Sequence, residues 1–139
     1  MMALEGIHVL DVASMLAGPY CATLLGDLGA DVIKVEPPRG DETRRFGPRR
    51  GLDSGVFVGV NRNKRSVRLD LRTADGQQVL RKLLVWADVV VDNLRASARA
   101  ALGLDRASVA AVNPRIISVS VSSFGPDGPS AGRPGIDPI

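Results

Sequence analysis

Short apolar runs alternate along this chain with longer segments in which apolar residues recur every three or four positions. The runs that have the length of buried β-strands are 7–12, 31–36, 89–91 and 116–121. The segments that have the spacing of amphipathic helices are 17–28, 73–87 and 105–113. Strands separated by helices of this length indicate crossover connections. The pattern therefore predicts an α/β fold with a largely parallel sheet.

Turn and cap residues mark the expected ends of the helices. Pro19 suits the first turn of a helix, where its missing N–H is not needed, and Gly29 suits the end of the same helix. Thr73 and Asp105 are good N-cap residues for the two later helices, and Asn113-Pro114 ends the last one. A short helical stretch is expected before Leu102-Gly103.

Two segments lack any periodicity. Residues 39–61 are rich in Gly, Pro, Arg and Asp, with Phe57 and Val58 as the main apolar content, and residues 122–139 are rich in Gly and Pro. Both are predicted to be irregular loops. Long loops in a compact domain are usually functional or mobile.

The segment 61–72 holds five basic residues, and its second half alternates. Val67, Leu69 and Leu71 would point to one side of a strand and the polar residues between them to the other. One interpretation is a loop and strand that present cationic side chains to a polyanion. The other is a solvated edge strand, in which charged residues discourage aggregation.

Charge is concentrated in one part of the chain. Residues 39–72 contain ten of the eighteen Lys and Arg but only four acids, whereas the rest has eight basic and eleven acidic residues. Such focusing favours one site for an anionic ligand. With three Phe, one Tyr and one Trp, the chain has few stacking platforms, which argues against a single-stranded nucleic-acid binder.

The expected location of a ligand follows from the parallel sheet. Ligands bind beyond the carboxyl ends of such strands. The segments expected there are Glu36 onward, Leu71-Arg72, Asp92-Asn93-Leu94-Arg95 and Ser122-Ser123-Phe124-Gly125. Three of the four contain Arg or lead into the basic loop, and this convergence favours the anion-site interpretation.

Several common chemistries have no motif in the sequence. There is no Gly-x-Gly-x-x-Gly, no phosphate loop of the ATPase type and no Gly-x-Ser-x-Gly elbow, and no spacing of ligands predicts a metal site. Cys21 is the single cysteine, which fits a reducing cytosol. With no visible signal peptide and no apolar run long enough to cross a bilayer, we expect a cytoplasmic protein without a membrane partner.

A series of local patterns, in a fixed order, covers nearly the whole chain. They are Leu4-Glu5-Gly6-Ile7, Leu10-Asp11, Ala17-Gly18-Pro19, Leu25-Gly26, Gly29 to Glu36, Asn61-x-Asn63-Lys64-Arg65-Ser66, Leu69-Asp70-Leu71, Ala87-Asp88-Val89, Asn93, Leu102-Gly103, Asn113 to Ile117 and Phe124-Gly125-x-x-Gly128-Pro129. Together they resemble the N-terminal part of a family III CoA-transferase. That family also contains formyl-CoA and carnitine-pathway transferases and the α-methylacyl-CoA racemases.

The resemblance implies a Rossmann-like, coenzyme A-binding domain over residues 1–139, within a larger protein that forms an interlocked homodimer. The small domain and the C-terminal part would lie outside this chain. The CoA-binding positions that the resemblance implies are Leu69, Asp70, Leu71, Arg72, Asn93, Leu94, Arg95, Gly135 and Ile136. Two positions depart from the family: Pro37 replaces a frequent Arg, with Arg39 a substitute for it, and Ala101 replaces a frequent basic residue.

The resemblance also implies a reaction. In the transferases an aspartate attacks an acyl-CoA thioester and becomes an aspartyl-CoA thioester, and a carboxylic acid accepts the CoA. That aspartate is expected beyond Ile139, so the 139-residue chain alone is expected to be inactive. Asp137 matches a different aspartate, with a structural or substrate-positioning role.

Two other functions remain open. The racemases carry a His at the position of Ile136, which cannot move a proton, so a transferase is favoured over a racemase. The third interpretation is a non-catalytic domain that binds an anion or nucleic acid.

Overall fold

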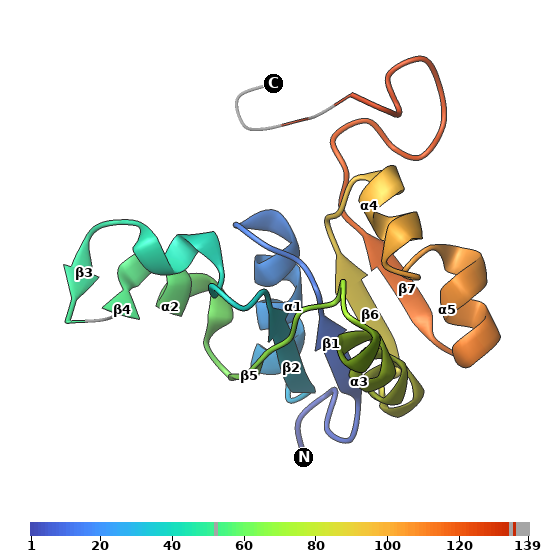
Figure 1. Cartoon of the computed structure of the whole chain (residues 1–139). Coiled ribbons are helices and arrows are strands. Elements are labelled where there is room, and N and C mark those ends of the chain that lie inside the picture. The colour runs from blue at the N-terminus through green and yellow to red at the C-terminus, as the bar shows by residue number, and fades with distance from the viewer. Residues whose placement is uncertain (52, 134, 136–139) are drawn as a thin grey trace.

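A single sheet of five strands, every neighbouring pair of which is parallel, forms the centre of the computed structural model, which describes residues 1–51, 53–133 and 135 (Figure 1). The elements in chain order are β1 (His8–Asp11), α1 (Ala17–Asp27), β2 (Asp31–Glu36), η1 (Glu42–Arg45), β3 (Arg49–Arg50), β4 (Asp53–Ser54), α2 (Gly55–Asn61), β5 (Lys64–Arg68), α3 (Ala74–Trp86), β6 (Val89–Asp92), α4 (Ala96–Ala101), α5 (Arg106–Val112) and β7 (Ile117–Ser120). The predicted α/β class and parallel sheet are confirmed.

The strand order places a switch point in the middle of the sheet. The order is β5-β2-β1-β6-β7, so the chain moves outward from β1 to β5, returns past β1, and continues to β7. This is the order of a Rossmann-like sheet, in which ligands bind where the direction reverses. The reversal here lies between β1 and β6.

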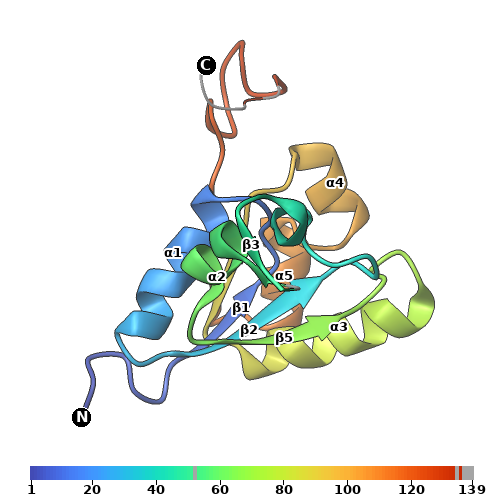
Figure 2. The same cartoon turned by 90° about the vertical axis from the view of Figure 1, so that its left-hand side faces the viewer.

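Helices cover both faces of the sheet. Figure 2 shows α1 on one face and α3 and α5 on the other. Because side chains alternate along a strand, β1 supplies Val9 to the cluster that contains Ala22 of α1, and Leu10 to the cluster that contains Leu80 and Val109 of the opposite helices. Among the described residues, no helix is long and apolar enough to cross a membrane.

The face toward α1 changes character along the strands. Val32, Lys34 and Glu36 alternate onto this face, and the in-register partners of the last two are Ser66 and Arg68 of β5. The face is therefore apolar near the amino ends of the strands and charged near their carboxyl ends. All of these charged groups need partners, because the sheet is covered there.

The predicted helix starts are confirmed by side-chain caps. Thr73 Oγ1 accepts the N–H of Gly76 at 3.1 Å, and Asp105 Oδ1 accepts the N–H groups of Ala107 and Ser108 at 3.1 Å. Each cap satisfies an N–H that has no partner within its helix. Pro19 lies in the first turn of α1, as expected.

The predicted strand around Val67 to Leu71 is displaced. The strand is Lys64–Arg68, and Leu69 and Leu71 follow it. The physical reason is the partner strand: β2 ends before Pro37, so the last bond of the ladder runs from the N–H of Leu69 to the oxygen of Glu36, at 2.9 Å. Both leucines still pack against the core, as the alternation predicted.

The prediction of an irregular loop over 39–61 is wrong in part. The segment contains η1, the β3–β4 hairpin and α2, and forms an arm beside the sheet (Figure 1). Tertiary contacts hold α2: its Val60 oxygen accepts hydrogen bonds from Thr23 Oγ1 (2.5 Å) and Lys64 Nζ (3.0 Å). A helix of seven residues that depends on such partners leaves little periodic signal. Residues 122–133 contain turns and bends without a helix or strand, as predicted for this part of the loop, and β7 ends one residue before the predicted strand end at Val121.

Candidate functional site

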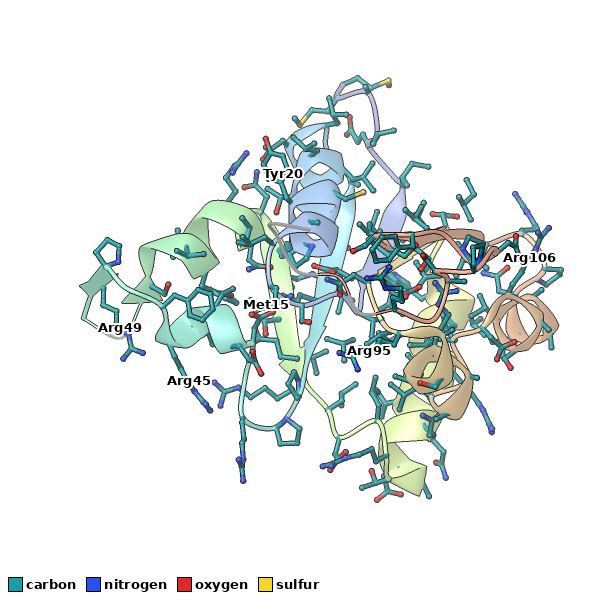
Figure 3. The ribbon with its side chains drawn as sticks, turned by 90° about the horizontal axis from the view of Figure 1, so that it is seen from above. Met15, Tyr20, Arg45, Arg49, Arg95 and Arg106 are labelled. Atoms are coloured by element: carbon teal, nitrogen blue, oxygen red, sulfur yellow. The ribbon has the colours of Figure 1, made fainter. Side chains whose placement is uncertain are left out.

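The turn after β1 and the segment after β6 are joined at the switch point. The Asn93 side chain accepts the N–H of Ser14 at 2.9 Å and donates to the oxygen of Ser14 at 2.8 Å. Met15 follows with a φ of 64°. A Cβ on Gly18 would lie 2.3 Å from the Cβ of Ala13, so only glycine lets α1 approach the turn this closely. In the view onto the sheet edge, Met15 lies centrally, with Arg95 on one side and Arg45 and Arg49 on the arm (Figure 3). Sequence reasoning did not identify this turn.

The first predicted contact segment, 69–72, lies at the end of β5. Arg72 donates to Asp70 through Nε (2.8 Å) and Nη2 (2.9 Å), and its side chain is 80% exposed. These bonds hold the pKa of Asp70 at about 2 and raise the pKa of Arg72. The guanidinium is thus held in place through its Nε and Nη2 atoms, and its remaining N–H groups can donate to an external acceptor. Leu69 and Leu71 turn toward the core instead.

The second predicted segment, 93–95, lies at the end of β6. Asn93 acts through the turn after β1, and Leu94 donates its N–H to Asp92 Oδ1 at 3.0 Å while its side chain packs against the core. Arg95 is exposed immediately before α4. Of this segment, only Arg95 presents a charge to solvent.

The remaining predicted positions are spread more widely. Arg39 is exposed in the turn after β2, and neither it nor Arg95 has an ion pair with another residue in the described ranges. Gly135 is exposed. Ile136 and Asp137 lie outside the described residues, so the structure does not bring them to the sheet edge or exclude them from it.

Most of the charge in 61–68 is used within the fold. Arg62 pairs with Asp27 at 2.5 Å, and Arg65 pairs with Asp31 at 2.6 Å near the amino end of β2. β5 is also an edge strand, so the edge-strand interpretation holds for this part of the segment. Arg68 is exposed and has no ion pair in the described part of the chain, and the exposed Arg72 and Arg95 lie further along.

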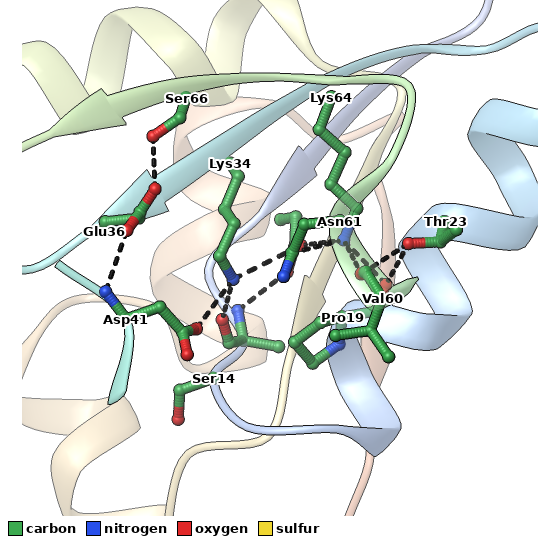
Figure 4. A network of polar contacts seen from close by, with 12 residues as sticks. Ser14, Pro19, Thr23, Lys34, Glu36, Asp41, Val60, Asn61, Lys64 and Ser66 are labelled. Atoms are coloured by element: carbon green, nitrogen blue, oxygen red, sulfur yellow. Dashed lines mark hydrogen bonds and ion pairs between the residues drawn. The ribbon is translucent and has the colours of Figure 1, made fainter. Parts of the chain in front are cut away.

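Lys64 lies inside the molecule rather than on its surface. Its ammonium donates to Asp11 Oδ2 (2.8 Å) and to the oxygens of Pro19 (2.7 Å), Val60 (3.0 Å) and Asn61 Oδ1 (3.0 Å) (Figure 4). Burial lowers the pKa of Lys64, and the Asp11 carboxylate opposes this effect. The side chain therefore joins β1, α1, α2 and β5 at one atom.

Glu36 forms a second node of the same network. It accepts two bonds from Arg44 (2.7 and 2.6 Å), one from the N–H of Asp41 (2.8 Å) and one from Ser66 Oγ. Burial alone would raise the pKa of Glu36, but these donors lower it to about 2. The sequence does contain a signal for this network. Lys34 and Glu36 are charged residues within an apolar strand run, and a strand covered on both faces requires partners for them.

The pKa of Glu36 predicts a pH dependence of stability. Because its pKa is lower in the folded state, its contribution is complete above about pH 4.5 and is lost as the pH falls toward 2. Allowing for solvent screening around Arg44, we expect the loss to be about 2 kcal/mol. Urea unfolding should therefore show that the free energy of unfolding falls more between pH 5 and pH 2.5 in the wild type than in Glu36→Gln. The other carboxylates titrate in both proteins, so the difference between the two falls reports on Glu36. Equal falls would contradict this assignment.

The arrangement can bind and orient an anion. Exposed guanidinium groups lie at the ends of β5 and β6, and between them α1 begins without a side-chain cap or an acidic residue in its first turn. Unpaired N–H groups at a helix start favour a negative or polarised oxygen. Among the described residues, no group of three or more His, Cys, Asp or Glu side chains could hold a metal ion.

Comparisons with known proteins extend this picture. A family model described as CoA-transferase family III matches residues 4–139. The succinate–glutarate CoA-transferase of Agrobacterium fabrum is 42% identical over 98% of this chain, and the human succinyl-CoA:glutarate CoA-transferase is 39% identical over 98%. A crystal structure of a CAIB/BAIF family protein from Brucella suis superposes with a TM-score of 0.93, at 42% identity over 98% of this chain.

The matched region is a fraction of each relative. The chain covers 36% of the Agrobacterium protein, 32% of the human protein and 37% of the Brucella chain. It therefore spans about a third of the length of the curated relatives it matches.

Proposed function

The chain belongs to CoA-transferase family III, and from this premise we propose that its sheet edge binds the coenzyme A part of an acyl-CoA thioester. Arg72 and Arg95, at the ends of β5 and β6, would contact the phosphates, together with Arg39 in the turn after β2. The observation that carries the proposal is the placement of Arg72. Its exposed guanidinium is held in one orientation by Asp70, and α3 begins two residues later. Arg suits phosphate because its planar donors match two oxygens at once.

The proposed activity is the transfer of CoA from an acyl-CoA to a carboxylic acid. The names of the relatives include succinate, succinyl-CoA and glutarate, so small dicarboxylic acids are the proposed substrate class. An aspartate outside this chain would attack the thioester carbonyl and release CoA as the thiolate. The thiolate would then attack the resulting anhydride, leaving an aspartyl-CoA thioester and the free acid. The residues described here would bind and orient the CoA thioester.

The proposal includes two properties of the whole protein. From the resemblance we expect a homodimer located in the cytoplasm. Gly135 and Ile136, as part of the CoA site, and Asp137, as a positioning residue, also belong to the proposal.

The proposal is tested by calorimetric titration of the protein with CoA and, separately, with a duplex DNA oligomer. CoA should bind with a modest salt dependence, whereas a protein that binds the phosphate backbone loses affinity steeply between 50 and 200 mM salt. Arg72→Ala should weaken CoA binding about tenfold, the effect of losing one charge-assisted hydrogen bond. Arg115→Ala is the control, because Arg115 precedes β7 and so lies near the amino ends of the strands, away from the proposed site at their carboxyl ends. Preference for DNA, or equal CoA affinity in both variants, would contradict the proposal.

A further inference from the structure

Lys34 is a buried charge that the proposed binding of CoA does not itself require. Its side chain is 1% exposed, and its ammonium lies 3.0 Å from Asp41 Oδ2 and 3.8 Å from Asp11 Oδ2. It also donates to the backbone oxygen of Ala13 at 2.9 Å (Figure 4). An apolar side chain could pack at this position of the sheet without the cost of burying a charge. The contact with Ala13 indicates what the charge does.

The Ala13 oxygen is one of four consecutive backbone groups that side chains hold. The N–H of Ala13 donates to Asp11 Oδ1 at 3.0 Å, its oxygen accepts from Lys34, and both polar groups of Ser14 are bound by Asn93. Side chains of β1 and β2 and of the segment after β6 thus fix two successive residues. Beyond them the chain passes through Met15, in the left-handed region, into α1. A conformation of this kind persists when its surroundings determine it.

Lys34 also connects this turn to the segment after β2. Its partner Asp41 is buried, accepts the Thr43 N–H at 2.9 Å, and donates its own N–H to Glu36 at 2.8 Å. One ammonium therefore sets the position of the turn after β1 relative to the turn after β2. Both turns lie at carboxyl ends of neighbouring strands, where the ligand is proposed to bind.

We propose, on the basis of the function proposed above, that Lys34 is a positioning residue for the acyl-thioester end of the bound substrate. It holds the turn at Ala13, Ser14 and Met15 in place at the switch point. The resemblance implies that the nucleotide end is bound elsewhere, by the segment 69–72 after β5, with which Lys34 has no hydrogen bond or ion pair in the described part of the chain. Loss of the Lys34 ammonium should therefore affect one end of the ligand and spare the other.

The test compares two ligands by calorimetry. Acetyl-CoA carries both ends, and adenosine 3′,5′-bisphosphate carries the nucleotide end alone. In Lys34→Met, acetyl-CoA affinity should fall about tenfold, because the turn loses one charge-assisted hydrogen bond. The affinity for the bisphosphate should stay within about twofold, since the guanidinium of Arg72 is held by Asp70 and has no contact with Lys34 in the described part of the chain.

A second variant separates an effect on ligand binding from a general loss of stability. Lys34→Met leaves Asp41 without its cation, so Lys34→Met/Asp41→Asn removes both charges and keeps the buried charge balanced. Arg65→Met is the matched control, because it removes an exposed ion pair from the same sheet near the other end of β2.

The outcomes separate the two proposals. Selective loss of acetyl-CoA binding in either Lys34 variant, with both ligands unaffected in Arg65→Met, supports the positioning role. An equal loss for both ligands, or unchanged acetyl-CoA binding, overturns it while leaving the function proposed above intact. If the wild-type protein binds neither ligand, the proposed function itself fails, and the positioning role with it.

Discussion

Replacing Lys64 by methionine is expected to lower the free energy of unfolding by about 3–5 kcal/mol, the cost of breaking a buried ion pair by removing one partner. The ammonium, whose side chain is 1% exposed, has four acceptors, and Asp11, which is fully buried, would lose its nearest cation. The oxygens of Pro19 and Val60 would also lose a donor, which weakens the attachment of α2 to α1.

The neighbouring residue provides the control. Arg65→Met removes an ion pair with Asp31 in which both side chains are well exposed, so its cost should be less than about 1 kcal/mol. Both variants take one positive charge from the same edge strand, and urea unfolding at pH 7 compares them directly. Similar losses in the two variants would show that the Lys64 network does not stabilise the fold as described.

Substitution of Gly76 by alanine is expected to destabilise the protein by about 3 kcal/mol, at the upper end of the usual cost of overpacking. A Cβ at this position would lie 2.0 Å from the carbonyl oxygen of Asp70 and 2.7 Å from its carbon. These are backbone atoms, so the segment that carries Asp70 and Arg72 must move. We therefore expect weaker CoA binding as well as a lower melting temperature.

Gly59→Ala is the matched control for this change. Gly59 lies in α2, and no heavy atom lies within 4 Å of the position of its added Cβ. Alanine is favoured over glycine in a helix by about 1 kcal/mol, so stability should be unchanged or slightly higher. A Gly76→Ala protein as stable as Gly59→Ala would mean that the close approach of α3 to Asp70 is not as described.

The sequence predicts the central α/β unit well because its signals are local. Short apolar runs identify β1, β2, β6 and β7, and the caps at Thr73 and Asp105 identify the starts of α3 and α5. Crossover spacing is sufficient to predict that the strands are parallel. Each of these features depends on residues close together in the chain.

The parts that sequence reasoning missed depend on distant partners. α2 is held by Thr23 and Lys64, and β5 ends where Pro37 ends its neighbour. The sequence shows that basic residues are concentrated in 61–72 but does not show that Lys64 is buried or that Arg65 pairs with Asp31. Net charge along a chain shows where cations are concentrated but not which of them have partners within the fold.

The same limit applies to the candidate site. Arg72 and Arg95 could be placed at strand ends from the order of the elements, and the structure brings them to the same edge of the sheet. The turn at Ser14 and Met15 could not be predicted, because it is defined by the side chain of Asn93, about eighty residues away in the chain.

The central claim is that the carboxyl edge of this sheet binds coenzyme A, and a residue-level map of the CoA titration by amide NMR tests it most directly. We expect the amide signals that shift to belong to residues 13–17, 69–73 and 93–96, at the ends of β1, β5 and β6. Shifts confined to residues 86–88 and 113–116, at the amino ends of β6 and β7, would contradict the claim that CoA binds at the carboxyl ends of the strands. The absence of any shift at saturating CoA would contradict it as well.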